Sequence, residues 1–353
     1  MAEAQQLSLI APDDFHHHLR DGAVLSDTAN AAARQFSRAL VMPNLVPPVT
    51  TAAAASEYKT RILSALSPEA RAADRFRPLM TMYLTDETTP EEIKQCFVGG
   101  DVKAVKLYPA GATTNSASGV TDYEKITPAL QAMQHYGLPL CIHGEVTDPA
   151  VDIFDRERVF IEKKLPDLLQ RASQLRVVLE HMTTKEAAQF VLSAGPNVAA
   201  TITPQHLLVN RNAMLAGGIR PHLYCLPILK TEEDRVALVG AATSGHPRIF
   251  LGTDSAPHAI GKKEAACGCA GVFSAHSAIE LYAEAFEQAG ALDKLEAFSS
   301  VNGAAFYGLE VNQHKVTLAL EPWKVPDSVP FGDSVVVPFG AGTTLRWKLQ
   351  HSW

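Results

Sequence analysis

The sequence has no long hydrophobic run. No apolar stretch approaches the roughly 20 residues that a helix needs to cross a bilayer. Residues 1–6 also lack the basic segment followed by an apolar one that marks a secretory signal peptide. We therefore expect no membrane association and a cytoplasmic location.

Cysteine is scarce and scattered, with five residues in a chain of 353. They are Cys96, Cys141, Cys225, Cys267 and Cys269. An odd number of dispersed cysteines, without a secretion signal, predicts reduced thiols rather than a disulfide framework. The spacing of the last two does not match a zinc ribbon.

Basic charge is also limited. The chain has 31 Lys and Arg residues against 38 Asp and Glu, which gives a formal net charge of −7. Because no basic tract is present, we expect no nucleic-acid partner. No Gly-x-Gly-x-x-Gly follows the first predicted strand, which weakens a dinucleotide-binding interpretation. The sequence also lacks a linker or low-complexity stretch, so a single domain over residues 1–353 is predicted.

Short apolar runs instead alternate with segments of helical periodicity. Eight candidate strands lie at residues 13–18, 39–42, 78–84, 102–107, 138–142, 177–179, 198–202 and 249–251. Regular alternation of strands and helices predicts a parallel sheet. Eight such units in roughly 250 residues favour a (β/α)8 TIM barrel, with an open doubly wound sheet as the alternative. The Val- and Pro-rich C-terminal residues predict a short extended tail.

Several local features complete this expectation. Helices are predicted at residues 153–165 and 292–306, and residues 203–230 are expected to be irregular. Thr121 with Glu124, and Thr183 with Glu186, have the spacing of helix-capping pairs.

Chemically active side chains gather at the predicted strand ends. On the first strand His16, His18 and Arg20 alternate onto one face, while His17 points the other way. Two imidazoles spaced in this way can bind one metal ion. The ends of other strands carry Asn44, Lys106, His143, His181 and Asp254. Because a barrel of this kind places its active site at these ends, imidazoles and a carboxylate there predict a zinc site.

Lys106 lies in the apolar sequence Ala-Val-Lys-Leu-Tyr, where a bare ammonium group is costly to bury. One alternative is a side chain that reaches solvent. A lysine among metal ligands is chemically sensible if it reacts with CO2, because the carbamate that forms is an anion able to bridge two metal ions.

Several motifs together resemble the dihydroorotases of the amidohydrolase superfamily, in their compact, single-domain bacterial-type branch (class II). The motifs are His16-x-His18-x-Arg20, Met42-Pro43-Asn44, Lys106-Leu107-Tyr108-Pro109, Ile142-His143-Gly144-Glu145, Glu180-His181-Met182-Thr183-Thr184 and Gly252-Thr253-Asp254-Ser255-Ala256-Pro257-His258. The resemblance extends over nearly the whole chain. Two small departures are His17 between the paired histidines and Gly111 in the polar loop of residues 109–119.

The resemblance implies a binuclear zinc centre. It assigns His16, His18 and Asp254 to one zinc, His143 and His181 to the other, and carboxylated Lys106 (N6-carboxylysine) to both. A hydroxide also bridges the metals, and Asp254 moves its proton. The implied reaction is the reversible cyclisation of N-carbamoyl-L-aspartate to (S)-dihydroorotate and water, the third step of de novo pyrimidine synthesis.

The resemblance also implies substrate contacts. Arg20 is expected to bind the substrate carboxylate through its planar guanidinium group. The other expected contacts are Asn44 and His258, backbone groups of Leu226 and Ala270, and Thr113 and Thr114 of residues 109–119, which form a lid. A simple connecting loop is the alternative for residues 109–119. Related proteins are commonly homodimers, so a homodimer is expected.

Three points stay open at this stage. Asp13, Asp14, Asp21 and Glu145 are all candidates for hydrogen bonding to the histidines, without a basis for choosing among them. Another cyclic amidohydrolase, such as a hydantoinase, dihydropyrimidinase or allantoinase, is the first rival. Those proteins usually carry an extra β-sandwich, and only 15 residues precede His16 here. A non-enzymatic scaffold is the second rival, which the filled ligand positions disfavour.

Overall fold

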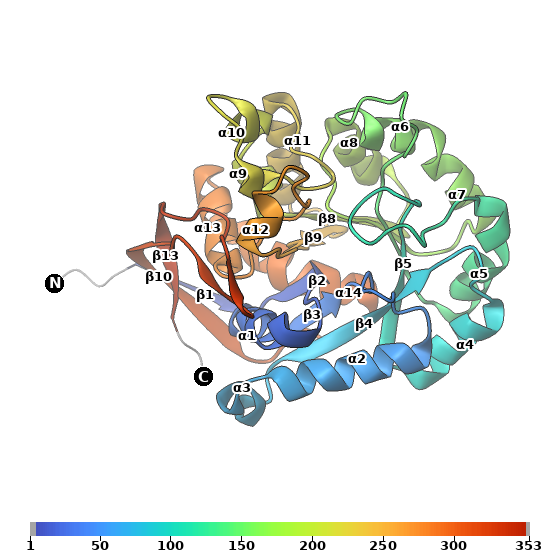
Figure 1. Ribbon diagram of the computed structural model, residues 1–353, viewed down its shortest axis with the longest axis horizontal. Coiled ribbons are helices and arrows are strands. Elements are labelled where there is room, and N and C mark those ends of the chain that lie inside the picture. The colour runs from blue at the N-terminus through green and yellow to red at the C-terminus, as the bar shows by residue number, and fades with distance from the viewer. Residues whose placement is uncertain (1–4, 351–353) are drawn as a thin grey trace.

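The structure, a computed structural model, describes residues 5–350 and is built around a closed barrel (Figure 1). Eight parallel strands follow one another in chain order from β2 to β9. They are β2 (Asp13–His17), β3 (Arg38–Val41), β4 (Arg77–Leu84), β5 (Val102–Leu107), β6 (Leu140–Ile142), β7 (Val177–Leu179), β8 (Val198–Ile202) and β9 (Ile249–Leu251). A parallel bridge between His17 and Ser255 brings the last strand back to the first. The predicted (β/α)8 barrel is confirmed, and the open sheet is wrong.

Helices surround the barrel. They include α1 (Leu25–Gln35), α2 (Ala52–Ala65), α3 (Pro68–Ala73), α4 (Pro90–Gly99), α5 (Tyr123–Tyr136), α8 (Lys185–Ser193), α11 (Glu232–Thr243), α12 (Ile260–Lys263) and α13 (Ala278–Gln288). Within residues 5–350, no helix has the length and apolar character needed to cross a membrane.

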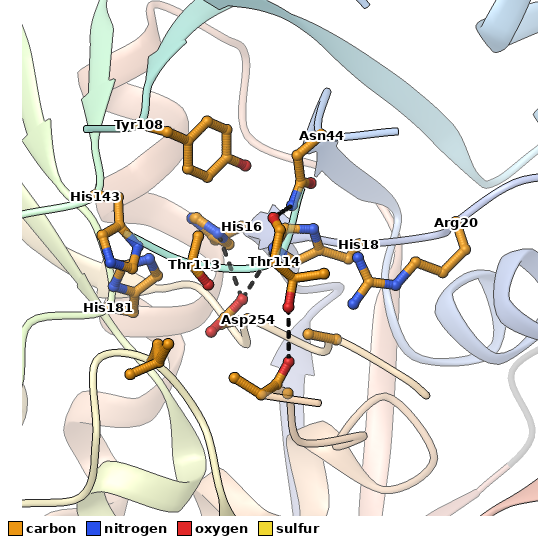
Figure 2. Close-up of a pocket in the computed structure, with 14 residues that line it drawn as sticks. His16, His18, Arg20, Asn44, Tyr108, Thr113, Thr114, His143, His181 and Asp254 are labelled. Carbon is orange, nitrogen blue, oxygen red and sulfur yellow. Dashed lines mark hydrogen bonds and ion pairs between the residues drawn. The ribbon is translucent and has the colours of Figure 1, made fainter. Parts of the chain in front are cut away.

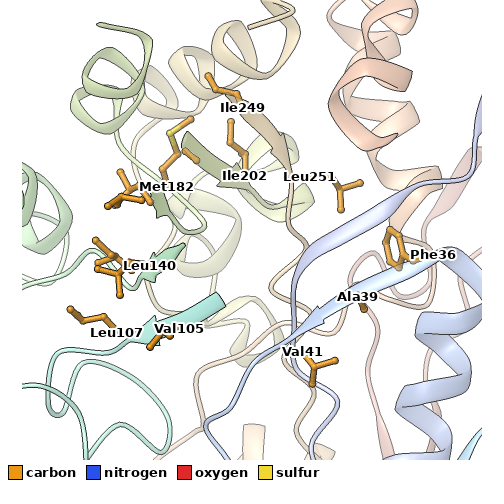
Figure 3. Packing of buried hydrophobic residues seen from close by; sticks show 14 of the residues in the cluster. Phe36, Ala39, Val41, Val105, Leu107, Leu140, Met182, Ile202, Ile249 and Leu251 are labelled. Carbon is orange, nitrogen blue, oxygen red and sulfur yellow. The ribbon is translucent and has the colours of Figure 1, made fainter. Parts of the chain in front are cut away.

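The two faces of each barrel strand meet different surroundings. Ala39 and Val41 of β3, and Val105 and Leu107 of β5, belong to the main apolar core, part of which Figure 3 shows. Their neighbour Leu40 belongs instead to a small cluster inside the barrel. Because side chains alternate along a strand, Lys106 lies on the inward face together with Ala104, whereas Lys103 is partly exposed. The alternation therefore places Lys106 inside the barrel.

Two of the expected helix starts are off by one residue. The side chain of Asp122, not Thr121, accepts the capping hydrogen bond of α5, since Thr121 donates to Asp86 instead. Thr184, not Thr183, caps α8. At each helix start two adjacent residues carry a suitable side-chain oxygen, so the sequence alone could not choose between them.

Three longer segments also differ from the expectation. Residues 153–165 contain α6 (Arg156–Lys163), and a separate helix, α7 (Leu165–Arg171), follows it. The segment expected to be irregular contains the short helices α9 (Pro204–Leu208) and α10 (Arg211–Leu215). The expected helix at 292–306 is divided into a 3-10 turn (Leu292–Lys294), a π-helical turn (Ala297–Val301) and α14 (Asn302–Tyr307).

The C-terminal tail forms a sheet with the start of the chain. Strand β10 (Lys315–Lys324) lies between β1 (Gln6–Ile10) and β13 (Thr344–Gln350), and both pairs are antiparallel. A hairpin of β11 (Val329–Phe331) and β12 (Ser334–Val336) lies between β10 and β13 in sequence. Trp347 is fully buried on β13, and its backbone N–H donates to Glu284 of α13. The extended tail was predicted, but its pairing with β1 was not.

Candidate metal and substrate site

A pocket lies over the ends of the barrel strands and gathers residues that are far apart in the sequence (Figure 2). Of the expected site residues, His16, His18, Arg20, Asn44, Thr113, Thr114, His143, His181, Leu226, Asp254 and Ala270 line it. Lys106 and His258 are not part of the lining. Tyr108, Ala256 and Gly271 line it as well, although they were not among the expected site residues.

The first ligand cluster contains His16, His18 and Asp254. One potential ligand atom from each residue lies within 4.8 Å of the other two. Asp254 Oδ1 is 3.0 Å from His18 Nε2 and 3.6 Å from His16 Nε2. Two imidazoles and a carboxylate at this separation form a donor set suited to zinc.

The second cluster contains His143 and His181, whose ring centroids are 4.9 Å apart. The ring of His16 is 4.8 Å from that of His181, so the two clusters adjoin. Within the described part of the chain, His16 Nε2 and His181 Nδ1 are buried nitrogens without a hydrogen-bond partner. Such atoms are expected where an ion completes the bonding.

Lys106 is close enough to both clusters to interact electrostatically with His16 and His181. Its side chain is fully buried, and its Nζ has no hydrogen-bond partner among residues 5–350. Burial lowers the pKa of Lys106, against the opposing effect of Glu180. A lowered pKa increases the fraction of neutral amine, which is the form that reacts with CO2. The alternative of a Lys106 side chain that reaches solvent is therefore wrong, and its surroundings fit a carbamate.

Burial also shifts the pKa values of four other expected ligands. It lowers the pKa of His16, His18 and His181 well below the usual range of histidine, with a further lowering by nearby cations. Neutral imidazole is the form that binds metal. Burial raises the pKa of Asp254 to about 7, although Lys106 opposes this effect.

Carboxylates hold the rings of two histidines in place. Glu180 Oε2 is 2.8 Å from His16 Nδ1, and Glu145 Oε2 is 2.7 Å from His143 Nε2. Each contact leaves the other ring nitrogen for a metal ion. No role was predicted for Glu180, although the residue directly precedes His181 at the end of β7.

The four acidic candidates can now be distinguished. Besides Glu145, Asp14 reaches a histidine, because its Oδ2 lies 2.6 Å from Nδ1 of His17. Asp13 pairs with Arg38, and Asp21 pairs with Arg61. Neither of these two is bonded to a ring of the site.

The guanidinium group of Arg20 lies at the rim of the pocket. Its Nη2 is 3.2 Å from His258 Nε2, and its Nε donates to the carbonyl of Pro257 at 3.2 Å. His258 Nε2 is also 3.0 Å from the carbonyl of Ala270. These contacts connect three of the expected substrate-binding positions into one group.

Residues 109–119, the expected lid, cover the pocket. Asn44 donates from Nδ2 to the carbonyl of Thr114, and Asn115 donates back from Nδ2 to the carbonyl of Asn44, both at 3.0 Å. The Thr114 hydroxyl donates to the carbonyl of Ala270 at 3.3 Å. Gly111 has a φ of 78°, a conformation that glycine adopts without strain. The segment is therefore held against the site by specific contacts.

Several site residues have strained backbones. Arg20, His181 and Asp254 have φ values of 61°, 40° and 45°. A non-glycine residue in this left-handed region costs of order 1–3 kcal/mol and persists only where its surroundings hold it. Such strain concentrates at functional sites.

Comparison of sequences finds close relatives over the full length of the chain, although no protein-family model matches it. The chain is 61% identical over 345 residues to a dihydroorotase of Nitrosococcus oceani, covering 98% of this chain and 99% of that protein. It is 61% identical over 346 residues to a dihydroorotase of Cupriavidus taiwanensis, with 98% and 99% covered.

Comparison of structures agrees. A dihydroorotase of Saccharomyces cerevisiae, solved in complex with 5-fluoroorotic acid, has a TM-score of 0.90 and 33% identity, with 98% of each chain covered. A dihydroorotase of Campylobacter jejuni has a TM-score of 0.89 and 35% identity, with 99% of each covered. An L-hydantoinase of Arthrobacter aurescens has a TM-score of 0.77 at 17% identity, with 97% of this chain and 82% of that protein covered, and shares the fold alone.

Proposed function

The chain belongs to the dihydroorotase family and is thus a cyclic amidohydrolase, and we propose that it interconverts N-carbamoyl-L-aspartate and (S)-dihydroorotate in pyrimidine biosynthesis. One observation supports this most: six side chains of ligand type converge at one end of the barrel, beside an arginine suited to a carboxylate. The five that line the pocket are His16, His18, His143, His181 and Asp254, and the sixth is the buried Lys106.

We propose two zinc ions for this centre. His16, His18 and Asp254 would hold one ion, His143 and His181 would hold the other, and the carbamate of Lys106 would contact both. The unpartnered nitrogens of His16, His181 and Lys106 support the assignment. Bound there, the ions supply Lewis acidity, which polarises the substrate carbonyl and lowers the pKa of a water molecule.

Asp254 is the proposed acid–base group. Its carboxylate faces His16 and His18 and is almost fully buried, so it can retain a proton instead of losing it to bulk water. In ring opening, the carboxylate would accept the proton of the attacking water and deliver it to the ring nitrogen that leaves. In ring closure it would move the proton in the reverse direction.

Recognition of the substrate depends on the rim of the pocket. We propose that Arg20 binds the substrate carboxylate through two parallel N–H donors, assisted by Asn44 and His258. Backbone groups of Leu226 and Ala270 would contact the ring edge. The negative net charge of the chain makes this local positive group necessary for an anionic substrate.

Thr113 and Thr114 would close over the bound molecule. Both line the pocket, and hydrogen bonds of Asn44 with the backbone of Thr114 and the side chain of Asn115 join this segment to the site, which supports the proposal. A closed lid excludes water and positions hydroxyl donors on the substrate.

We also propose that residues 1–353 form a single domain that acts as a cytoplasmic homodimer. The family assignment supports this, and sedimentation velocity of the purified chain tests it. A mass of one chain over the working concentration range would contradict the dimer.

Assays of three substrates in parallel test the proposed reaction against the hydantoinase alternative. The purified, zinc-loaded protein is given (S)-dihydroorotate, hydantoin and dihydrouracil in parallel. We expect turnover of dihydroorotate alone, because the other two rings lack the carboxylate that Arg20 would bind. Preference for an uncharged ring would reject the proposal.

A further inference from the structure

One buried carboxylate connects the two segments that carry His16 and Asp254. Asp14 precedes His16 on β2, and its side chain is 1% exposed. Its Oδ1 accepts hydrogen bonds from the backbone N–H of His16 at 3.0 Å and of Thr253 at 2.9 Å. Its Oδ2 accepts from the hydroxyl of Thr253 at 2.5 Å and lies 2.6 Å from His17 Nδ1. A single side chain thus binds both segments.

These contacts lie at the seam of the barrel, the junction of β2 with the residues that follow β9. The backbone at the seam is joined by the bridge between His17 and Ser255. The N–H of Asp254 donates to the carbonyl of His16 at 2.9 Å, and the N–H of His18 donates to the carbonyl of Ser255 at 3.0 Å. Two of the three proposed ligands of one metal, His16 and Asp254, therefore depend on this junction for their separation.

The backbone of Asp254 adds a second requirement. Its φ of 45° is in the left-handed region, which a residue with a side chain adopts only when its surroundings hold it there. Thr253, directly before it, is held by Asp14 through both its N–H and its hydroxyl. The same hydroxyl accepts from the N–H of Ser255 at 3.0 Å. The residues on either side of Asp254 are thereby fixed.

We propose that Asp14, together with His17 and Thr253, is a positioning group that sets the separation of His16 and Asp254 for metal binding. The inference rests on the proposed metal centre. Asp14 makes no contact with the pocket, so it acts through the ligands and not on substrate. His17 is also the position at which this chain departs from the motif it resembles, and its imidazole provides one of the four contacts to Asp14.

A purely structural role is the alternative, and the neighbouring residue provides a matched control. Asp13 is on the same strand, is equally buried, and bonds to Arg38 and Asn312. Loss of either carboxylate should destabilise the fold. Only loss of Asp14 should also loosen the pair of metal ligands.

The experiment compares Asp14→Asn with Asp13→Asn. In Asp14→Asn, an amide NH2 group replaces one acceptor oxygen. This group is a donor, so it cannot accept the hydrogen bonds that His17 and Thr253 direct at that position. Zinc affinity is measured on the metal-free proteins by competition with a chelator, and the free energy of unfolding is measured on the same samples. We expect zinc affinity to fall by about 10- to 100-fold in Asp14→Asn and to be unchanged in Asp13→Asn. Equal zinc affinity in the two variants would overturn the inference.

A milder pair covers the case in which Asp14→Asn does not fold. Thr253→Val removes the hydroxyl that binds Asp14, whereas Thr253→Ser keeps it. We expect weakened zinc binding in the valine variant and near-normal binding in the serine variant, and equal binding would overturn the inference. A wild-type protein that binds zinc but does not open dihydroorotate would refute the proposed reaction and leave the test of Asp14 valid.

Discussion

His16 Nδ1 lies 2.8 Å from Glu180 Oε2, so the first strand of the barrel is bonded to the end of the sixth. Glu180 also accepts a hydrogen bond from the hydroxyl of Thr201 at 2.6 Å. Thr201 in turn accepts from the backbone N–H of His181 at 2.7 Å. One hydrogen-bonded chain therefore connects residues proposed to bind different metal ions.

Replacement of Glu180 by glutamine should weaken metal binding. The amide keeps the size of the side chain but removes the charge that makes His16 a better ligand. We expect zinc affinity to fall by about 10-fold or more, measured by competition with a chelator. Glu162→Gln, on the exposed face of α6, is the control and should have no effect. Wild-type affinity in Glu180→Gln would show that the contact is not needed for metal binding.

Replacement of Arg20 by lysine should damage substrate recognition more than chemistry. Lysine keeps the charge but loses the planar pair of donors. We expect KM for dihydroorotate to rise about 10-fold, equivalent to roughly 1.4 kcal/mol of lost binding, with a smaller change in kcat. Steady-state kinetics measures both constants. If neither constant changes, Arg20 does not bind the carboxylate.

Two variants of Asn115 separate the roles of its side chain and its backbone. The residue has a φ of 54° and donates from Nδ2 to the carbonyl of Asn44. Asn115→Gly removes the side-chain amide but still adopts the positive φ without strain. Asn115→Ala removes the amide and is also strained at this φ. We expect both to lower kcat/KM because the lid closes less often, with the alanine variant lower. Equal activity of the glycine variant and the wild type would mean that the amide does not hold the lid.

Acid should destabilise the protein partly through His206. Burial lowers the pKa of this residue to about 3, and its ring is bonded to the Thr203 hydroxyl and the Pro227 carbonyl. The unfolded chain, with an ordinary histidine pKa of about 6.5, binds more protons between these values. The contribution of buried, neutral His206 to the free energy of unfolding is therefore complete above pH 6.5 and is lost as the pH falls towards 3.

The variant His206→Gln keeps a donor and an acceptor but does not titrate. Between pH 7 and pH 5, the wild type should lose about 2 kcal/mol of unfolding free energy relative to this variant. Urea titrations at both pH values measure the difference. Parallel pH dependence in the two proteins would mean that His206 is not held neutral.

The barrel was predictable because its signals are local and repeated. β5 and β8 have the bounds that their apolar runs predict. The pairing of β1 with β10 was not predictable, because it joins residues more than 300 positions apart through backbone hydrogen bonds. Helix α7 was also missed, because the predicted helix ended at Leu165 and Pro166 lies in the first turn of α7, where proline is tolerated.

The site, too, contains residues that the sequence could predict and residues that it could not. His16, His18 and Asp254 were selected because residue type and position at strand ends agree, and the structure brings them together. Glu180 and Asp14 were harder to assign, since a buried carboxylate acquires its role from partners that only the closed barrel supplies. Four acidic residues near the motifs looked alike in sequence, and their partners in the structure distinguish them.

The most direct test of the account is a zinc titration of the metal-free protein, with ring opening of (S)-dihydroorotate followed by ultraviolet absorbance on each sample. Because the proposed centre holds two zinc ions, activity should rise with bound zinc and reach its maximum near two ions per chain. Asp254→Ala should lose at least about 100-fold in kcat while retaining the fold by circular dichroism. Full activity without zinc, or near-normal turnover by Asp254→Ala, would contradict the account.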